Sequence, residues 1–202
     1  MSNLQAILLL GPTGSGKTPL GDCLAARGLW GRRCWHFDFG AQLRAAAGSR
    51  PAELSPADLA VIENALTTGA LLEDHQFPIA RRILESFIRI NGCKPDDLIV
   101  LNGMPRHTGQ ARDVARIVQI VAVISLECPA EVVYQRIGSN TGGDRAGRVD
   151  DDVAAIARKL ELYRQRTTPL IDHYRKLGVK IIRIAVGVNT TALEAWHDCS
   201  AI

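Results

Sequence analysis

The sequence of 202 residues predicts an α/β fold in which one parallel β-sheet lies between two layers of helices. Short aliphatic runs recur at residues 6–10, 34–37, 98–101, 120–126 and 179–184, and stretches with helical spacing separate them. A short run without polar alternation is typical of a strand buried on both faces. Because strands that alternate with helices are joined by crossover connections, the sheet is expected to be parallel.

A glycine-rich loop follows the first predicted strand and opens the first predicted helix. The loop has the pattern G-x-x-x-x-G-K-[ST] and consists of Gly11, Pro12, Thr13, Gly14, Ser15, Gly16, Lys17 and Thr18. In such a loop the backbone N–H groups surround phosphate oxygens, the lysine reaches the outer phosphates, and the final hydroxyl can bind Mg²⁺. The sequence therefore predicts binding of a nucleoside triphosphate with Mg²⁺.

Two further segments interrupt the alternation of strands and helices. Residues from about 39 to 94 are too many for one crossover and have helical spacing, so we expect a helical insert that includes a helix starting at Ser55-Pro56. Residues from about 138 to 148 are polar and glycine-rich, which predicts a short lid. A single domain remains, with its core at 1–38, 95–137 and 149–202. We expect the long helix in its last part to bend near Pro169, and a closing helix to turn Leu193 and Trp196 inward.

Composition narrows the class of protein. No apolar run reaches the length of a membrane span, and no export leader is evident, so a cytoplasmic protein without membrane attachment is expected. The five cysteines have no C-x-x-C spacing and the five histidines have no ligand spacing, so neither a disulfide framework nor a zinc site is expected. Most of the 24 basic residues are arginines, but the net charge is only +3 and no basic run alternates with aromatics, which argues against nucleic-acid binding.

Four further motifs carry a resemblance to a known family. They are Asn102-Gly103-Met104-Pro105-Arg106 followed by Gln110, the segment 36–44 that ends in Leu43-Arg44, the segment 69–74, and Arg148-Val149-Asp150-Asp151 followed by Lys159 and Tyr163. Together with the glycine-rich loop, they resemble the adenylate kinase family of nucleoside monophosphate kinases from about residue 5 to residue 185. The resemblance implies a P-loop kinase three-layer sandwich with strand order 2-3-1-4-5, in which the helical insert binds the nucleoside monophosphate (NMP).

The resemblance also assigns roles to individual residues. Arg44 and Arg106 would bind the α-phosphate of the acceptor, Gln110 the edge of its base, and the backbone of Leu72 the same base. The resemblance also places Phe39, Gly40 and Gly103 in the same acceptor site. On the donor side, Lys17 would follow the transferring phosphoryl group, Arg136 would lie over the adenine, and three cations would close from the lid side: Arg145, Arg148 and Lys159.

The chain departs from the family pattern at residues near the metal and near the acceptor base. Asn102 and Ala41 stand where the family has aspartates, and we expect Thr18 and Asp38 to take over the placement of Mg²⁺. Phe39 stands where a threonine commonly faces the acceptor base, and Lys159 where the family has an arginine. These replacements leave the identity of the acceptor open.

The predicted activity is transfer of the γ-phosphate of ATP to a nucleoside monophosphate, with AMP as the expected acceptor and two ADP as products. We expect a monomer. Two other functions remain open on the sequence alone: a P-loop kinase of another small metabolite, and a nucleotide-binding regulator whose Mg²⁺ chemistry is weakened by Asn102 and Ala41.

Overall fold

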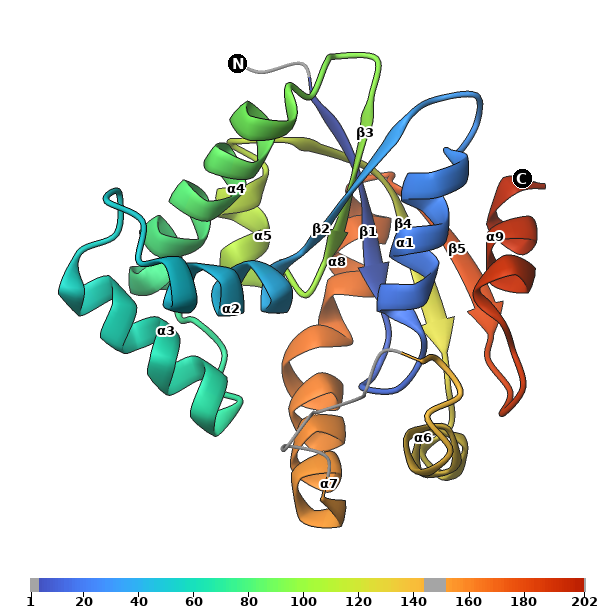
Figure 1. The fold of residues 1–202 in the computed structure, drawn as a ribbon. Helices are drawn as coiled ribbons and strands as arrows, with labels where there is room; N and C mark the ends of the chain where they lie inside the picture. Colours follow the sequence, from blue (N-terminus) through green and yellow to red (C-terminus); the bar gives the residue numbers. More distant parts are fainter. Residues whose placement is uncertain (1–3, 144–151, 202) are drawn as a thin grey trace.

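Five strands form one parallel sheet in the computed structural model, which describes residues 4–143 and 152–201 (Figure 1). The order across the sheet is β2-β3-β1-β4-β5, as the resemblance implied. The strands are β1 (Gln5–Leu10), β2 (Cys34–Asp38), β3 (Leu98–Asn102), β4 (Gln119–Glu127) and β5 (Lys180–Ala185). Each predicted strand is confirmed to within two residues at either end.

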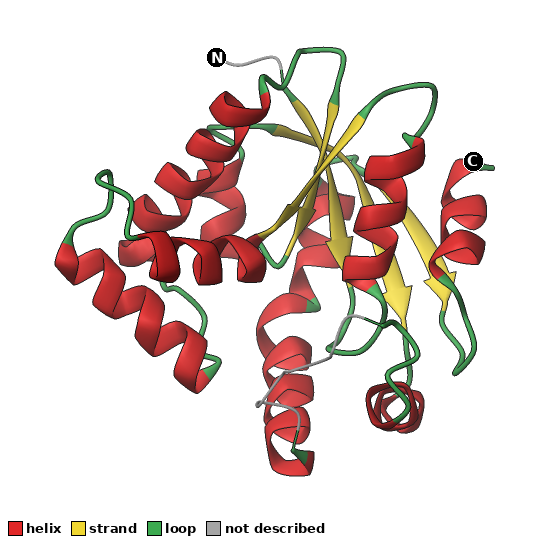
Figure 2. Ribbon diagram, in the orientation of Figure 1, coloured by secondary structure: helices red, strands yellow, loops and turns green. Residues whose placement is uncertain are grey.

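Helices cover both faces of the sheet (Figure 2). Along β1, Leu8 and Leu10 belong to one buried cluster while Ile7 and Leu9 belong to another, as expected for a strand with two apolar faces. One cluster includes residues of α4 (Phe77–Asn91), α5 (Thr108–Val114) and α8 (Pro169–Lys176). The other includes residues of α1 (Lys17–Arg27) and α9 (Ala192–Ser200). The three-layer arrangement is therefore confirmed.

The chain between β2 and β3 is helical, with α2 (Phe39–Ser49), α3 (Pro56–Thr68), the single turn η1 (Asp74–Gln76) and α4. In Figure 1, α2 and α3 extend to the side of the sheet. The start of α3 is the predicted one, because Ser55 and Asp58 form a reciprocal capping box and Pro56 occupies the first turn. The two caps satisfy N–H groups that the helix itself leaves unpaired.

After β4 the chain forms α6 (Ala130–Gly138) and, beyond residues 144–151, α7 (Val153–Leu162). The predicted lid residues Arg145 and Arg148 lie outside the described residues. A π-helical segment, η2 (Tyr163–Thr167), joins α7 to α8 where we expected a bend. Thr168 N donates to Tyr163 O at 2.9 Å, a bond to the fifth residue back, and Pro169 has no N–H to continue the α-helical pattern.

The last helix, α9, packs on α1 with a different face from the one that we expected. Ala195 and Cys199 are buried, whereas Leu193 is 41% exposed, so the prediction that Leu193 turns inward is wrong. Trp196 is partly buried and donates its indole N–H to Gly28 O at 2.9 Å. None of the helices in the described part of the chain is long and apolar enough to span a membrane.

Because all five strands are parallel, their carboxyl ends meet at one edge of the sheet. The glycine-rich loop leaves β1 at this edge, Asp38 ends β2 and Asn102 ends β3. Ligands of open α/β sheets bind at this edge, next to the point where the strand order reverses. The fold thus brings segments distant in sequence to one site.

Candidate active site

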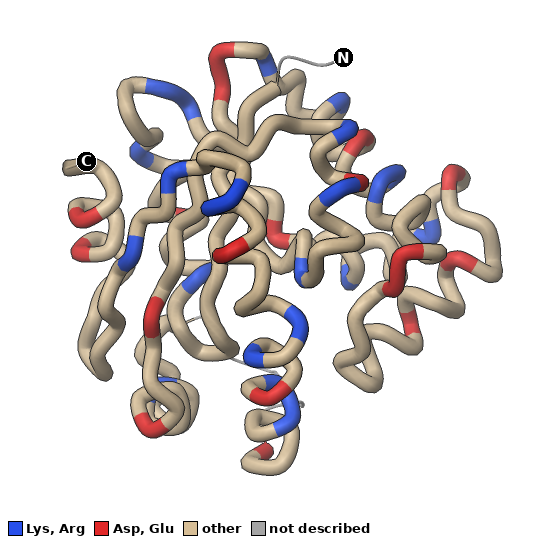
Figure 3. Tube along the Cα trace, turned by 180° about the vertical axis from the view of Figure 1, so that it is seen from behind, with Lys and Arg blue, Asp and Glu red and all other residues tan. Residues whose placement is uncertain are grey.

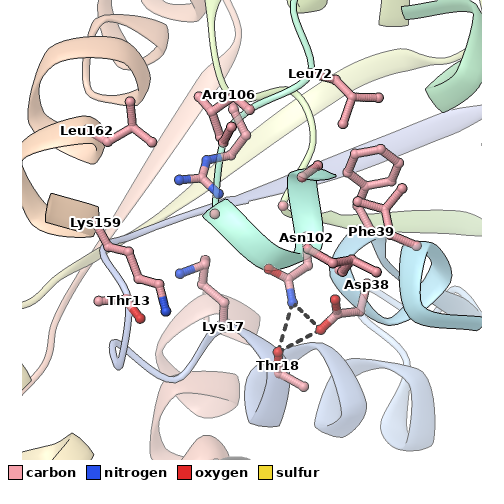
Figure 4. A pocket seen from close by; sticks show the side chains of 18 of the residues that line it. Thr13, Lys17, Thr18, Asp38, Phe39, Leu72, Asn102, Arg106, Lys159 and Leu162 are labelled. Atoms are coloured by element: carbon pink, nitrogen blue, oxygen red, sulfur yellow. Dashed lines mark hydrogen bonds between the residues drawn. The ribbon is translucent and has the colours of Figure 1, made fainter. Parts of the chain in front are cut away.

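A cavity of about 270 Å³ opens at the carboxyl edge of the sheet, between the glycine-rich loop and the helical insert (Figure 4). Fifteen predicted site residues line it: Gly11, Thr13, Gly14, Gly16, Lys17, Thr18, Asp38, Phe39, Gly40, Arg44, Leu72, Gly103, Arg106, Gln110 and Lys159. Apolar side chains that the sequence did not single out complete the wall: Leu43, Leu66, Leu71 and Leu162. Most of the residues predicted separately for donor and acceptor therefore share one cavity.

The glycine-rich loop has the backbone shape of an anion cradle. Gly14 and Gly16 have φ values of 75° and 92°, at which a residue with a side chain would be strained. In addition, a Cβ on Gly14 would crowd Ile137. Gly16 precedes α1 and offers no side chain to cap its first N–H groups, an arrangement that favours an anion at this helix start. Lys17 folds over the loop and donates from Nζ to Gly11 O at 2.8 Å and Pro12 O at 2.7 Å.

The side chains of Thr18, Asp38 and Asn102 form a hydrogen-bonded triangle at the floor of the cavity (Figure 4). Thr18 Oγ1 donates to Asp38 Oδ2 at 2.8 Å. Asn102 Nδ2 lies 3.1 Å from Thr18 Oγ1 and 3.1 Å from Asp38 Oδ2 and donates to both. Since the Thr18 proton points to Asp38, a lone pair of its oxygen is directed away from the carboxylate. Hydroxyl and carboxylate oxygens are the ligands that Mg²⁺ takes in proteins, so these residues fit that ion.

Two arginines reach the cavity from the acceptor side. Arg106 is half-buried and donates from Nε to Thr167 Oγ1 at 3.3 Å, while Thr167 donates back to Arg106 O at 2.9 Å. Burial lowers the pKa of Arg106 from its ordinary value, although a guanidinium stays charged in water-accessible protein sites. Among residues 4–143 and 152–201, neither Arg44 nor Arg106 has a carboxylate within 4.0 Å. Neither cation is thus neutralised by a carboxylate of the described residues, and both line the cavity where an anion can reach them.

Many of the other arginines in the described part of the chain pair with a carboxylate. Figure 3 shows Lys and Arg residues interspersed with Asp and Glu along the trace seen from behind. Arg82 pairs with Asp58 at 2.7 Å, and Arg166 reaches across to Glu73 with two bonds, at 3.0 and 3.2 Å. The arginine-rich composition therefore does not mark the site, whereas the position of Arg44 and Arg106 does.

The predicted contacts to the acceptor base lie together but are bonded to each other. Gln110 is buried, donates from Nε2 to Leu72 O at 2.7 Å and accepts the backbone N–H of Arg106 at 2.8 Å. His107 Nε2 is also 3.1 Å from Leu72 O. Phe39 is buried and its ring stacks on Phe37 at 6.0 Å. The side chain of Gln110 therefore joins the strand-end loop to the insert in this structure.

Three predicted donor-site residues lie outside the main cavity. Pro12 contributes the carbonyl that Lys17 binds, and Ser15 is buried. Arg136 is only 4% exposed, and its guanidinium donates to Gly14 O at 3.1 Å and to the carbonyls of residues 187, 188 and 190 at 2.8 to 2.9 Å. Ser15 and Arg136 line a second cavity of about 130 Å³ behind the loop. Arg136 thereby links the glycine-rich loop to the β5–α9 connection.

Sequence reasoning missed two groups next to the site. His36 was set aside because it has no ligand spacing, yet its Nε2 is 3.4 Å from Asn102 Nδ2 and its Nδ1 is 2.8 Å from Asp22 Oδ1. Thr167, which bonds Arg106, was not singled out in the sequence. In the sequence, a histidine two residues before Asp38 on the same strand was the available signal for the first group, since alternate strand residues share a face.

The chain is similar in sequence to proteins named adenylate kinase. One from Prochlorococcus marinus (strain MIT 9303) is 31% identical over 180 residues, which cover 87% of each chain. One from Synechococcus sp. (strain WH7803) is 30% identical over 200 residues, covering 95% of this chain and 97% of that one. This chain belongs to the adenylate kinase family. As a member of that family, it is a phosphotransferase.

The similarity of this chain to a solved structure is one of fold. A crystal structure of a gluconokinase from Sinorhizobium meliloti 1021 superposes with a TM-score of 0.58 at 15% identity, covering 100% of this chain and 92% of that one. No family model matches the chain. The adenylate kinase family member described here therefore shares the P-loop kinase fold with a kinase of a different name, and its acceptor has to be argued from its own site.

Proposed function

We propose that the protein transfers the γ-phosphate of ATP to a nucleoside monophosphate, with AMP as the acceptor and ADP as both products. The supporting observation is a single cavity lined by a phosphate loop on one wall and by Arg44 and Arg106 on the other. Two phosphorylated ligands brought together carry several negative charges, which require cations on both sides. Membership of the adenylate kinase family supports the same reaction class.

The donor phosphates would lie along the glycine-rich loop. The N–H groups at the start of α1 would donate hydrogen bonds to phosphate oxygens. Lys17 would exchange its two carbonyl partners for oxygens of the outer phosphates. The donor base would lie toward the second cavity and Arg136. Because Nε and Nη1 of Arg136 already donate to carbonyls, its contribution to the base would come from the face of the guanidinium.

The acceptor would lie in the half of the cavity formed by the insert at 39–94. Its phosphate would bridge Arg44 and Arg106, and its base would contact Phe39, Leu72 and Gln110. The amide of Gln110 retains one N–H and one oxygen lone pair beyond its bonds to Leu72 and Arg106, and these groups can meet the edge of a base. An acceptor phosphate oxygen attacks directly, so no nucleophilic side chain is required.

Mg²⁺ would be placed by Thr18 Oγ1 and, through its water ligands, by Asp38. When bound with ATP, the ion neutralises phosphate charge during transfer. Lys159 lines the same cavity from α7 and would add positive charge, as would Arg145 and Arg148 in the lid at about 138–148. A preorganised cation of this kind typically contributes about 3 kcal/mol to the transition state.

The test is an assay of purified protein with ATP, Mg²⁺ and, separately, AMP, GMP, CMP, UMP, gluconate and shikimate. Chromatography should show diphosphate formation with AMP at the highest kcat/KM. Inhibition by diadenosine pentaphosphate, which carries two nucleosides on one phosphate chain, should be competitive with both substrates. Phosphorylation of gluconate or shikimate without reaction of any monophosphate would overturn the proposal.

Lys17→Ala provides the matched negative variant for this assay. Removing a cation from the transferring phosphoryl group should lower kcat by about two to three orders of magnitude. Lys180→Ala, on the outer strand β5, is the control and should leave kcat within about twofold, because Lys180 does not line either cavity behind or in front of the loop.

A further inference from the structure

A second layer of residues lies behind Thr18, Asp38 and Asn102, and the members of that layer come from α1 and β2. His36 is on β2, two residues before Asp38, and Asp22 is on α1, four residues after Thr18. His36 Nδ1 is 2.8 Å from Asp22 Oδ1, and His36 Nε2 is 3.4 Å from Asn102 Nδ2. The imidazole therefore stands between a surface carboxylate and the amide that contacts the Mg²⁺-binding side chains.

The hydrogen bonds define which ring nitrogen donates. A carboxylate only accepts and an amide nitrogen only donates, so Nδ1 of His36 donates to Asp22 and Nε2 accepts from Asn102. The amide nitrogen of Asn102 is the matching donor. The opposite orientation of the amide would turn Oδ1 of Asn102 toward the carboxylate of Asp38, which places two acceptors against each other.

Burial makes this acceptor important for Asn102. Asn102 is 4% exposed, and one N–H of its amide is shared between Thr18 and Asp38. Without His36, the second N–H would lose the acceptor that the structure gives it, and a buried donor without a partner is unfavourable. The amide would then rotate to find another acceptor and would release Thr18 and Asp38.

The packing of α1 on β2 is arranged to admit the imidazole. Gly21 faces His36, and a Cβ on Gly21 would overlap the ring at Nε2, Cδ2 and Cε1. The His36 side chain is 7% exposed, whereas that of Asp22 is 68% exposed. Thr18, Gly21 and Asp22 have the spacing of one helix face. A single face of α1 therefore carries the hydroxyl that bonds Asp38, the glycine that leaves room for the His36 ring, and the carboxylate that binds this ring.

We infer that His36, held by Asp22, is a positioning residue that fixes the amide of Asn102 and thereby holds Thr18 and Asp38 in the orientation that receives Mg²⁺ with the nucleotide. This role rests on the proposed ATP·Mg²⁺ binding at the same loop. It explains how the chain keeps an ordered metal side although Asn102 and Ala41 replace two carboxylates of the family pattern.

The test measures binding of ATP without an acceptor, so that turnover is not involved. Calorimetry gives the Kd of ATP in EDTA and in saturating Mg²⁺, and the ratio of the two is the metal enhancement. His36→Leu should lower this enhancement by about tenfold, within the usual effect of partners that orient metal ligands, while the Kd in EDTA changes less than about twofold. His36→Gln, which keeps an acceptor at the position of Nε2, should restore the enhancement to within about threefold of the unchanged protein.

Two further variants keep the result decisive. Asp22→Ala, at an exposed position, should fold normally and lower the enhancement in the same direction by about threefold, even if His36→Leu does not fold. His197→Leu, an exposed histidine on α9, is the matched control and should leave the enhancement unchanged. A full enhancement in His36→Leu, or in Asp22→Ala where His36→Leu does not fold, would overturn the role of His36. Absence of ATP binding in the unchanged protein would instead overturn the proposed function together with this role.

Discussion

The hydroxyl of Thr18 donates to the carboxylate of Asp38 across 2.8 Å, which joins the start of α1 to the end of β2. These residues lie 20 positions apart in the chain, and both line the cavity. The carboxylate beside Thr18 therefore comes from the end of β2, whereas Asn102 and Ala41 occupy the positions of the aspartates in the family pattern.

Asp38→Ser should separate two roles of Asp38. Asp38 Oδ1 accepts from Ala41 N at 3.0 Å and caps α2, and serine can replace this cap without supplying a carboxylate. We expect the Mg²⁺ concentration for half-maximal turnover to rise about tenfold or more, with unfolding stability changed by less than about 1 kcal/mol. Asp38→Ala should show the same Mg²⁺ effect and lose about 1 kcal/mol in addition. An unchanged Mg²⁺ dependence in both variants would remove Asp38 from the metal side.

Arg106→Lys should reduce phosphate binding on the acceptor side although it keeps the charge. A lysine cannot reproduce the paired N–H donors of a guanidinium, and it loses the Nε bond to Thr167. We expect kcat/KM for the acceptor to fall by about 100-fold while the Kd of ATP stays within about twofold. Arg116→Lys, an exposed surface residue paired with Asp113, is the control and should leave steady-state kinetics unchanged. Equal effects of the two substitutions on kcat/KM would contradict the assignment of Arg106 to the acceptor phosphate.

Tyr174→Phe should not destabilise the protein. The Tyr174 hydroxyl is buried and has no hydrogen-bond partner in the described part of the chain, and burial raises its pKa above the ordinary value. Removing an unpaired buried polar group is expected to be neutral or to stabilise by about 1 kcal/mol. Urea unfolding should show this, with Leu170→Ala on the same helix losing about 2–5 kcal/mol as the packing control. A loss of more than 1 kcal/mol in Tyr174→Phe would reveal a partner for the hydroxyl.

Asp58→Asn should weaken the protein in a pH-dependent manner. Hydrogen bonds from Ser55, followed by the ion pair with Arg82, hold the pKa of Asp58 below its ordinary value of 3.8. Because the folded-state pKa is depressed, the stabilisation is present above about pH 4 and is lost as pH falls through the folded-state value. We expect the variant to lose about 1 kcal/mol at pH 7 and less at pH 3, measured by urea unfolding. Asp172→Asn, an exposed control, should lose little stability at either pH. An equal loss of stability for Asp58→Asn at pH 7 and pH 3 would contradict a stabilisation that comes from the ionised carboxylate.

Much of the fold was predictable because its strands are short, aliphatic and buried on both faces. The run at 98–101 has no polar alternation, so it fits few positions other than a central parallel strand, and β3 occupies Leu98–Asn102. The capped start of α3 was likewise evident from Ser55-Pro56. The π-helical segment was not, since the periodicity from 156 to 174 continues through it, and only the bond from Thr168 to Tyr163 distinguishes it.

Most of the candidate site could be assembled from motifs, because the glycine-rich loop, Asp38 and Asn102 each follow or end a strand at the same edge of the sheet. Contacts between elements could not. His36 and Asp22 are 14 residues apart and meet only because Gly21 allows β2 to approach α1. Arg136 has the sequence setting of a residue on a helix surface, but it is buried against carbonyls more than 50 residues away. Such contacts depend on packing, which the spacing of motifs does not specify.

The central claim is that this site transfers a phosphoryl group from a bound triphosphate to a monophosphate in the same cavity. The most direct measurement uses ATP labelled in its γ-phosphate together with unlabelled AMP and Mg²⁺, followed by separation of the products. The account predicts that the label appears in ADP at the rate of ATP loss and that Lys17→Ala slows this transfer by about two to three orders of magnitude. Label found only in inorganic phosphate, or retained in ATP while the nucleotide is bound, would contradict it.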